Sequence, residues 1–208
     1  NNQIASFYTG AMANAGELSF RSVAGVGKES LVIVSPNDPG AMVSYAEECS
    51  AMGIPYIWDP GQQCARMSGS ELKDGITGAT IVICNDYEFE LIRQKTGLSE
   101  QDVLGEAGAL IVTKGEHGCT VLTRDGAADV KAVPPDRIVD PTGVGDAFRG
   151  GLMKGLADGR PLPECAQMGS VAATWALEHL GGTSHAYTWP EFQVRYAQHY
   201  GSLGPRPS

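Results

Sequence analysis

The sequence predicts an α/β fold in which helices cover both faces of a mostly parallel sheet, a doubly wound arrangement in three layers. Two apolar runs, residues 31–34 and 81–84, contain no polar side chain, which is typical of strands buried on both faces. Strand-like and helix-like stretches also alternate along the first half of the chain. Because a strand–helix–strand unit joins parallel strands by a crossover, this alternation predicts a parallel sheet.

The elements of this first half follow one another in a simple order. Strands are expected at residues 30–35, 55–59, 80–84 and 109–113. A helix is expected at residues 39–52, between the first two strands, and two more are expected at residues 86–96 and 101–105, between the third and fourth strands. The first helix follows Pro36-Asn37-Asp38-Pro39, a sequence that provides a turn and a helix start.

The pattern changes after residue 118. Residues 119–123 and 127–133 are expected to form a β-hairpin, because Asp125-Gly126 between them is a favoured turn pair. Two further helices are expected, at residues 145–157 and 162–179.

The chain is expected to form one domain followed by a short tail. Its 208 residues suffice for one well-buried core. We assign residues 1–200 to the domain, with the first seven residues read as a strand. Residues 201–208, rich in Gly, Pro and Ser, are expected to form a flexible tail. The abrupt start, without an initiator Met, suggests a piece of a longer protein.

Composition narrows the class of protein. The formal net charge of −9 argues against nucleic-acid binding, because phosphate backbones are bound by Lys and Arg. No apolar run approaches the ~20 residues of a membrane span, and no signal peptide is recognisable. Five scattered cysteines fit neither a disulfide framework nor a zinc site, so we expect a reducing cytoplasm, with Cys84 and Cys119 as buried packing residues.

The segment from Asp140 to Gly151 carries the strongest chemical signal. Gly143 and Gly145 form a glycine-rich turn that leads into a helix. Amides of such a turn and the positive end of the helix favour an anion such as phosphate. Asp146 then falls in the first helical turn, where it would be placed to accept the proton of a hydroxyl attacking a γ-phosphate. The alternative is a surface carboxylate that only favours the helix dipole.

Several motifs together resemble the ribokinase (PfkB-like) carbohydrate kinase family. The string from Asp140 to Asp146 is similar to the family signature Asp-Thr-x-Gly-Ala-Gly-Asp, with Pro141 before Thr142 and Val144 in the usual Ala position. Asn85-Asp86-Tyr87-Glu88 resembles the family's Asn-x-x-Glu motif. Residues 113–118 resemble its nucleotide loop at the end of a strand. The motifs occur in the family's order, and the resemblance covers residues 1 to about 200.

The resemblance implies a phosphotransferase that uses ATP and magnesium, with a ribokinase-like fold. Asp146 would be the general base, and Gly143, Val144 and Gly145 would form the anion hole that stabilises the transferring phosphoryl group. Magnesium would be ordered by Asn85 and Glu88. Asp140, together with the Thr142 carbonyl, would match the family's site for a monovalent cation such as potassium.

The resemblance also implies nucleotide contacts. These would come from Thr113, Gly115 and Gly118 in the nucleotide loop, and from His179 and Gly182 near the adenine pocket. Taken alone, Asn85 and Glu88 would read as a turn and a helix start, and His179 as a helix-capping residue.

The substrate that would accept the phosphoryl group is predicted from sequence resemblance alone. Trp58-Asp59-Pro60-Gly61-Gln62 and the first seven residues look closest to the bacterial adenosine-kinase-like branch, which favours the 5′-hydroxyl of adenosine. A sugar acceptor of the ribokinase or fructokinase type is the alternative. The family resemblance also implies that an N-terminal part with the first strands and a lid is absent, and it leaves a homodimer open.

Two other classes of function are alternatives to a kinase. A non-catalytic nucleotide-binding protein or inactive fragment on the same fold remains open, although Asp146 and both glycines count against it. A dinucleotide-dependent oxidoreductase is disfavoured, because no Gly-x-Gly-x-x-Gly follows the first visible strand.

Overall fold

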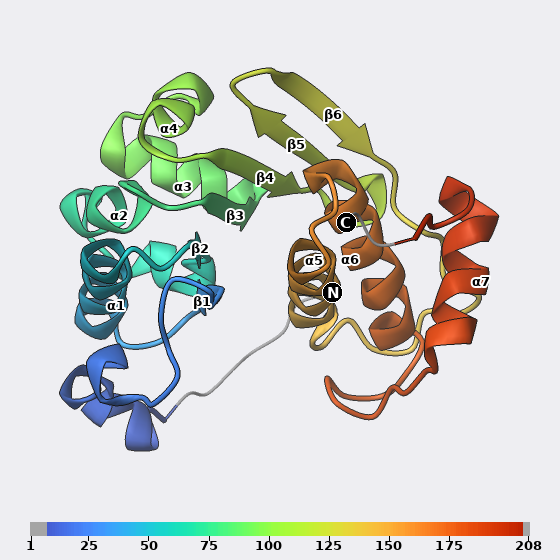
Figure 1. Ribbon diagram of the computed structural model, residues 1–208, viewed down its shortest axis with the longest axis horizontal. Coiled ribbons are helices and arrows are strands. Elements are labelled where there is room, and N and C mark those ends of the chain that lie inside the picture. The colour runs from blue at the N-terminus through green and yellow to red at the C-terminus, as the bar shows by residue number, and fades with distance from the viewer. Residues whose placement is uncertain (1–7, 206–208) are drawn as a thin grey trace. The chain divides into compact units, whose positions relative to one another are not determined.

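The computed structural model describes residues 8–205 of the chain (Figure 1). The strand expected at residues 1–7 lies outside this range. The chain divides into two compact units, residues 1–110 and 111–208. Within the described residues, six strands form one sheet in sequence order, from β1 to β6. Two of its pairings, β1 with β2 and β2 with β3, are parallel, whereas β5 and β6 pair antiparallel. The predicted α/β fold is therefore confirmed.

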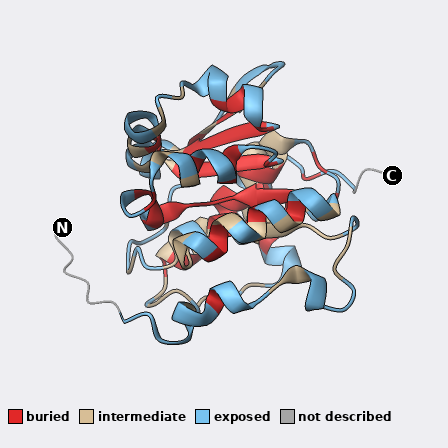
Figure 2. Cartoon of the chain, turned by 90° about the vertical axis from the view of Figure 1, so that its left-hand side faces the viewer, coloured by how far each residue is buried: buried red, intermediate tan, exposed pale blue. Residues whose placement is uncertain are grey.

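The first unit contains the alternating elements. In chain order they are η1 (Gly10–Glu17), η2 (Phe20–Ser22), β1 (Val32–Val34), α1 (Pro39–Met52), β2 (Tyr56–Trp58), η3 (Gly61–Ala65), α2 (Gly69–Ile76), β3 (Ile81–Asn85), α3 (Asp86–Thr96) and α4 (Glu100–Glu106). Figure 2 shows the strands buried among helices whose outer faces are exposed. The side chain of Trp58 in β2 fits against Gly75 in α2, where an added Cβ would lie 2.1 Å from the indole ring.

The second unit contains the hairpin and the three last helices. Strand β4 (Ala109–Thr113) spans the boundary between the units. The elements that follow are η4 (Gly115–His117), β5 (Cys119–Thr123), β6 (Gly126–Val130), α5 (Val144–Ala157), α6 (Leu162–Leu177) and α7 (Trp189–Tyr200). The predicted hairpin is confirmed, but its second strand ends at Val130, three residues early, because the Val133 N–H donates to Ser170 Oγ at 3.0 Å instead of to a strand.

Helices α5 and α6 lie side by side because glycines remove the side chains between them (Figure 1). A Cβ at Gly151 would lie 2.5 Å from the Met168 carbonyl oxygen, and one at Gly155 would lie 2.8 Å from Cys165 Cα. Larger residues at these positions would push the helices apart. The close packing fixes α5, whose first turn carries the glycine-rich segment.

Two helices were missed by the sequence analysis, α2 and α7. Both begin with a capping box, in which a Ser or Thr side chain accepts from the third helical N–H and a Glu side chain bonds back. Ser68 with Glu71, and Thr188 with Glu191, form these pairs. The spacing Ser/Thr-x-x-Glu is therefore the sequence signal that could have found both helices.

Cys84 and Cys119 are buried, as predicted, and so are the other three cysteines. In the part of the chain that the structure describes, none of the helices combines the length and apolarity needed to cross a bilayer. The boundary at residue 200 stays a prediction. Beyond it, Leu203 is buried with Phe192 and Tyr196, and the Gly204 carbonyl accepts a hydrogen bond from Arg160 at 2.8 Å.

Candidate active site

The first turn of α5 contains the residues that were predicted to form an anion hole. Gly143 is the N-cap, with φ 78°, and Val144 begins the helix. The first intrahelical bond runs from the Ala147 N–H to the Gly143 carbonyl at 2.9 Å, so the amides of Val144, Gly145 and Asp146 precede it. The Val144 N–H donates to Pro141 at the long distance of 3.3 Å. The turn thus presents backbone donors at the positive end of a 14-residue helix.

Asp146 is exposed in this same first turn. Its carboxylate is therefore within the same helical turn as the amides of Gly145 and of Asp146 itself. Only residues 143–145 were named from the sequence for the anion hole, whereas the structure places the Asp146 amide in the same first turn, ahead of the first intrahelical bond. Its position in the first turn is the signal that could have added it.

Gly143 packs directly against Gly182 from the loop after α6. A Cβ built on Gly143 would lie 2.6 Å from Gly182 Cα, closer than real Cβ contacts allow. Gly143 also has a positive φ, which only glycine adopts without strain. The structure therefore brings together two residues that were predicted separately, one for the anion hole and one for the nucleotide pocket. Gly145, by contrast, has helical geometry, and the nearest atom to a Cβ there is the flexible Arg149 guanidinium at 3.1 Å.

The Asp140 carboxylate holds these two loops together. Its Oδ1 accepts the Thr142 N–H at 2.9 Å, and its Oδ2 accepts the Gly181 N–H at 2.8 Å. Hydrogen bonds from the Thr142 backbone, the Thr142 side chain and the Gly181 backbone hold the pKa of Asp140 below its ordinary value. The carboxylate therefore stays charged at neutral pH. Its observed role is to bridge the turn before α5 and the loop after α6, and a role toward a monovalent cation stays a prediction.

The segment that leads to Asp140 has no regular structure and is hydrogen-bonded to α6. Val133 is bonded at both main-chain groups, to Ser170 Oγ and Thr174 Oγ1, each at 3.0 Å. The N–H groups of Val139 and Asp140 both point at the Leu177 carbonyl, at 2.9 and 3.3 Å. Helix α6 thus positions the turn through its polar side chains and its last carbonyl.

The predicted nucleotide loop is a tight turn between β4 and β5. The Lys114 N–H donates to the Gly118 carbonyl at 2.7 Å, and the Gly118 N–H donates to Gly115 at 3.0 Å. Gly118 has φ 85°, and a Cβ there would lie 2.0 Å from the Val130 carbonyl oxygen. Gly118 is thus needed for the turn itself. Thr113, the last residue of β4, is half-buried, and Gly115 is exposed. The nucleotide contacts of both residues stay predictions.

Asn85 and Glu88 form a capping box at the start of α3, in the first unit. The Glu88 N–H donates to Asn85 Oδ1 at 2.7 Å, and the Asn85 N–H donates to Glu88 Oε2 at 2.8 Å. This arrangement orients a carboxylate at the end of the buried strand β3. Magnesium keeps most of its waters and needs only one or two carboxylates beside substrate phosphates, so the pair fits such an ion. The described residues contain no cluster of three or more His, Cys, Asp or Glu that could hold a metal alone.

His179 follows the C-terminus of α6. Its Nδ1 is 2.8 Å from the Trp175 carbonyl, which is a capping interaction of the kind expected from sequence alone. This bond fixes the ring against the last turn of the helix. A contact between His179 and an adenine ring stays a prediction.

The fold is that of an α/β protein with a glycine-rich turn and an exposed carboxylate at the start of a helix, and comparison with known proteins gives the family. The family model described as pfkB family carbohydrate kinase matches residues 1–189. The chain belongs to this family, as the motifs predicted.

Individual relatives agree with this assignment. The chain is 28% identical over 199 residues to a nucleoside kinase of Methanocaldococcus jannaschii, an alignment that covers 96% of this chain and 64% of the relative. A structure of Burkholderia thailandensis nucleoside kinase in complex with ADP-inosine superposes with a TM-score of 0.93 at 37% identity. That alignment covers 100% of this chain and 64% of the solved one. The chain therefore spans just under two thirds of the length of these relatives.

Proposed function

We propose that the protein is an ATP-dependent phosphotransferase that acts on a hydroxyl group of a nucleoside. The observation that carries the proposal is the first turn of α5, where Gly143 packs on Gly182 and Asp146 is exposed beside the leading amides. The similar proteins support a nucleoside as the acceptor. They include two nucleoside kinases, and one similar solved structure is a nucleoside kinase in complex with ADP-inosine. Adenosine is the acceptor we favour, on the sequence resemblance described above.

In this proposal Asp146 acts as the general base. Its carboxylate takes the proton of the acceptor hydroxyl while the hydroxyl oxygen attacks the γ-phosphorus of ATP. The bond between that phosphorus and the β,γ-bridging oxygen breaks, and ADP carries away the bonding electrons. The amides at the start of α5 donate to the phosphoryl oxygens as negative charge develops there. The small cradle formed by Gly143 and Gly182 lets the nucleotide approach the backbone.

Thr113 and Gly115 are further residues of the proposed nucleotide site, and Asp140 has a supporting role. Asp140 keeps the turn before α5 bound to the loop after α6 through the Thr142 and Gly181 amides. Thr113 ends strand β4 and Gly115 lies in the loop after it, which would contact phosphates or ribose. Magnesium, when bound, would neutralise phosphate charge, and Asn85 and Glu88 are the residues we propose to order it.

A panel of acceptors tests the proposed function. We expect ATP turnover by the purified protein with adenosine, inosine or cytidine at a kcat/KM well above that with ribose or fructose. A pocket built to pair the polar groups of a base rejects acceptors that lack it. Measured initial rates of ADP formation give the order of acceptors. Turnover restricted to the two sugars would support a sugar kinase, and calorimetric ATP binding without any turnover would support the non-catalytic alternative.

The magnesium role of Glu88 can be separated from its capping role. In Glu88→Gln the amide still fits a capping box, so we expect the free energy of unfolding to change by less than about 0.5 kcal/mol. Loss of the charge should raise the magnesium concentration for half-maximal rate about 10–100-fold. Initial rates across a magnesium titration at saturating ATP measure this shift.

A matched control is Glu71→Gln. Glu71 holds the same position in the capping box of α2. The Glu71→Gln substitution should leave the magnesium dependence of the rate unchanged. If Glu88→Gln also leaves the magnesium dependence unchanged, Glu88 is a helix cap and has no part in metal binding.

A further inference from the structure

Arg195 on α7 is the centre of a partly buried polar network behind the candidate site. Its guanidinium pairs with both carboxylate oxygens of Glu178, at 2.8 and 2.9 Å. It also contacts Asp136 at 3.2 Å, and its central carbon lies 4.2 Å from the centre of the Trp175 ring. One arginine thus joins α7, the end of α6 and the segment that leads to Asp140.

Burial and charge show that the pair with Glu178 is held as an ion pair. The side chains of Glu178 and Arg195 are only 7% and 12% exposed. Burial by itself raises the pKa of Glu178, but hydrogen bonds from Arg195 and from the Asp136 N–H outweigh it, so the pKa lies below its ordinary value. A buried ion pair adds little net stability compared with apolar packing of the same volume. A positional role therefore accounts for this network better than a stabilising one.

The network connects directly to the residues that shape the turn. Glu178 is the C-cap of α6, and its Oε1 also accepts the Asp136 N–H at 2.7 Å. The neighbouring Leu177 carbonyl accepts the N–H groups of Val139 and Asp140. Asp140 then bridges to Thr142 and Gly181. The end of α6 thus fixes residues 136–140 at three amides, and these residues in turn fix the Gly143–Gly182 contact.

The loop on the other side of this contact is tied to the same arginine. Loop residues 179–188 join α6 to α7. In this loop the Tyr187 ring stacks on Trp175, with centroids 5.4 Å apart, and His185 stacks on Tyr187 at 6.3 Å. Trp175 is therefore in contact with both Arg195 and Tyr187. Both loops that meet at the glycine cradle depend on contacts that include Arg195 or its direct partners.

We infer that Arg195, acting through Glu178 and Trp175, is a positioning residue that sets the nucleotide-binding loops around Gly143 and Gly182. This inference rests on the proposed function for its kinetic part. It assigns Arg195 to nucleotide affinity and leaves the chemical step to Asp146. Arginine is suited to the task, because its planar fork binds a carboxylate through two parallel bonds while its face stacks on an aromatic ring.

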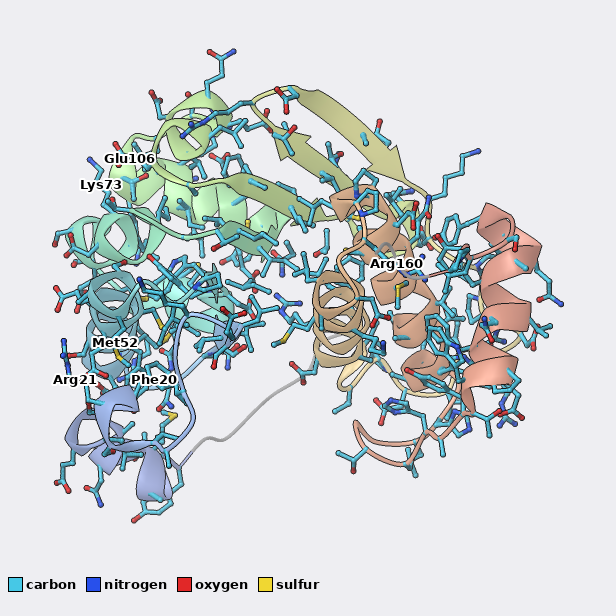
Figure 3. The ribbon with its side chains drawn as sticks, viewed as in Figure 1. Phe20, Arg21, Met52, Lys73, Glu106 and Arg160 are labelled. Atoms are coloured by element: carbon cyan, nitrogen blue, oxygen red, sulfur yellow. The ribbon has the colours of Figure 1, made fainter. Side chains whose placement is uncertain are left out.

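The test compares Arg195→Lys with Arg160→Lys. Arg160 (labelled in Figure 3) is also buried and pairs with Glu164 at 3.2 Å and with the Gly204 carbonyl. Glu164 lies at the start of α6, at the opposite end from Leu177 and Glu178. Both substitutions keep the charge and replace a guanidinium that bonds through two nitrogens with a single ammonium group, so the control reports the general cost of disturbing a buried arginine.

For Arg195→Lys we expect a rise of about 3–30-fold in KM for ATP and in Kd for ADP, with kcat within about threefold of the parent. Amide hydrogen exchange, measured by NMR, should become faster at Gly181 and Thr142. Arg160→Lys should change none of these quantities by more than about twofold. Glu178→Gln, which keeps the shape but removes the charge, should shift the same amides and affinities in the same direction.

The outcomes separate this inference from the proposed function. Unchanged exchange at Gly181 and Thr142 in both Arg195→Lys and Glu178→Gln overturns the positioning role, whatever the activity. Equal effects of Arg195→Lys and Arg160→Lys on ADP affinity overturn it as well. If the parent protein shows no turnover, the proposed function fails, and the exchange and ADP-binding measurements still decide whether Arg195 sets the loops.

Discussion

Asp146→Asn is expected to lower kcat by about 100–10,000-fold, because an amide cannot accept the proton of the attacking hydroxyl. The side chain keeps its size in the exposed first turn of α5, so the fold should be retained. Loss of the favourable charge–dipole interaction should reduce the free energy of unfolding by only about 0.3–1 kcal/mol. Steady-state kinetics with the preferred nucleoside measure kcat, and calorimetry with ADP shows whether nucleotide binding persists.

Glu100→Gln is the matched control for this substitution. Glu100 is an exposed carboxylate in the first turn of α4, so the change removes the same kind of charge–dipole interaction. We expect a similar small loss of stability and no change in kcat. Full activity of Asp146→Asn would remove Asp146 as the base, and with it the mechanism proposed for this site.

Gly143→Ala is expected to have the second largest effect, a loss of about 100–1000-fold in kcat/KM. The new Cβ would lie 2.6 Å from Gly182 Cα, and φ at this position is 78°. Backbone atoms cannot move aside as a flexible side chain can, so the first turn of α5 must shift and its amides lose their convergence on one phosphoryl group. The substitution acts on the backbone geometry, and both kcat and nucleotide affinity should fall.

A control for the positive φ alone is Gly97→Ala. Gly97 ends α3 with φ 74°, and a Cβ there would meet nothing within 4 Å. We expect Gly97→Ala to cost about 1–2 kcal/mol of stability without loss of activity. Thermal or denaturant unfolding and kinetics on both variants distinguish strain from the clash. Wild-type kcat/KM in Gly143→Ala would contradict the proposed role of the cradle.

Much of the fold could be predicted because its signals are local. The predicted helices 39–52 and 86–96 coincide with α1 and α3, where Asp38 and Asn85 supply N-caps and Gly53 and Gly97 supply left-handed C-caps. Helices α2 and α7 were missed because the glycines of α2 and the aromatic residues of α7 weaken the propensity signal. In both cases the capping box was the stronger signal.

In the candidate site, too, some features follow from local sequence and others arise only from contacts between distant residues. The glycine turn and Asp146 could be named from the sequence, because a phosphate site at a helix start requires those residue types in a short stretch. The contact between Gly143 and Gly182, and the bridge from Asp140 to Gly181, join positions about forty residues apart in the chain. No local pattern specifies such a pair.

The sequence by itself determined the α/β class, the family and the residues of the first turn of α5, because each depends on residue type and short-range spacing. Only the tertiary structure decided that Asp140 bridges two loops and that Arg195 pairs with Glu178 at the end of α6. These roles depend on which distant side chains meet after packing. Packing is set by the shape of the whole core and cannot be read from neighbouring residues.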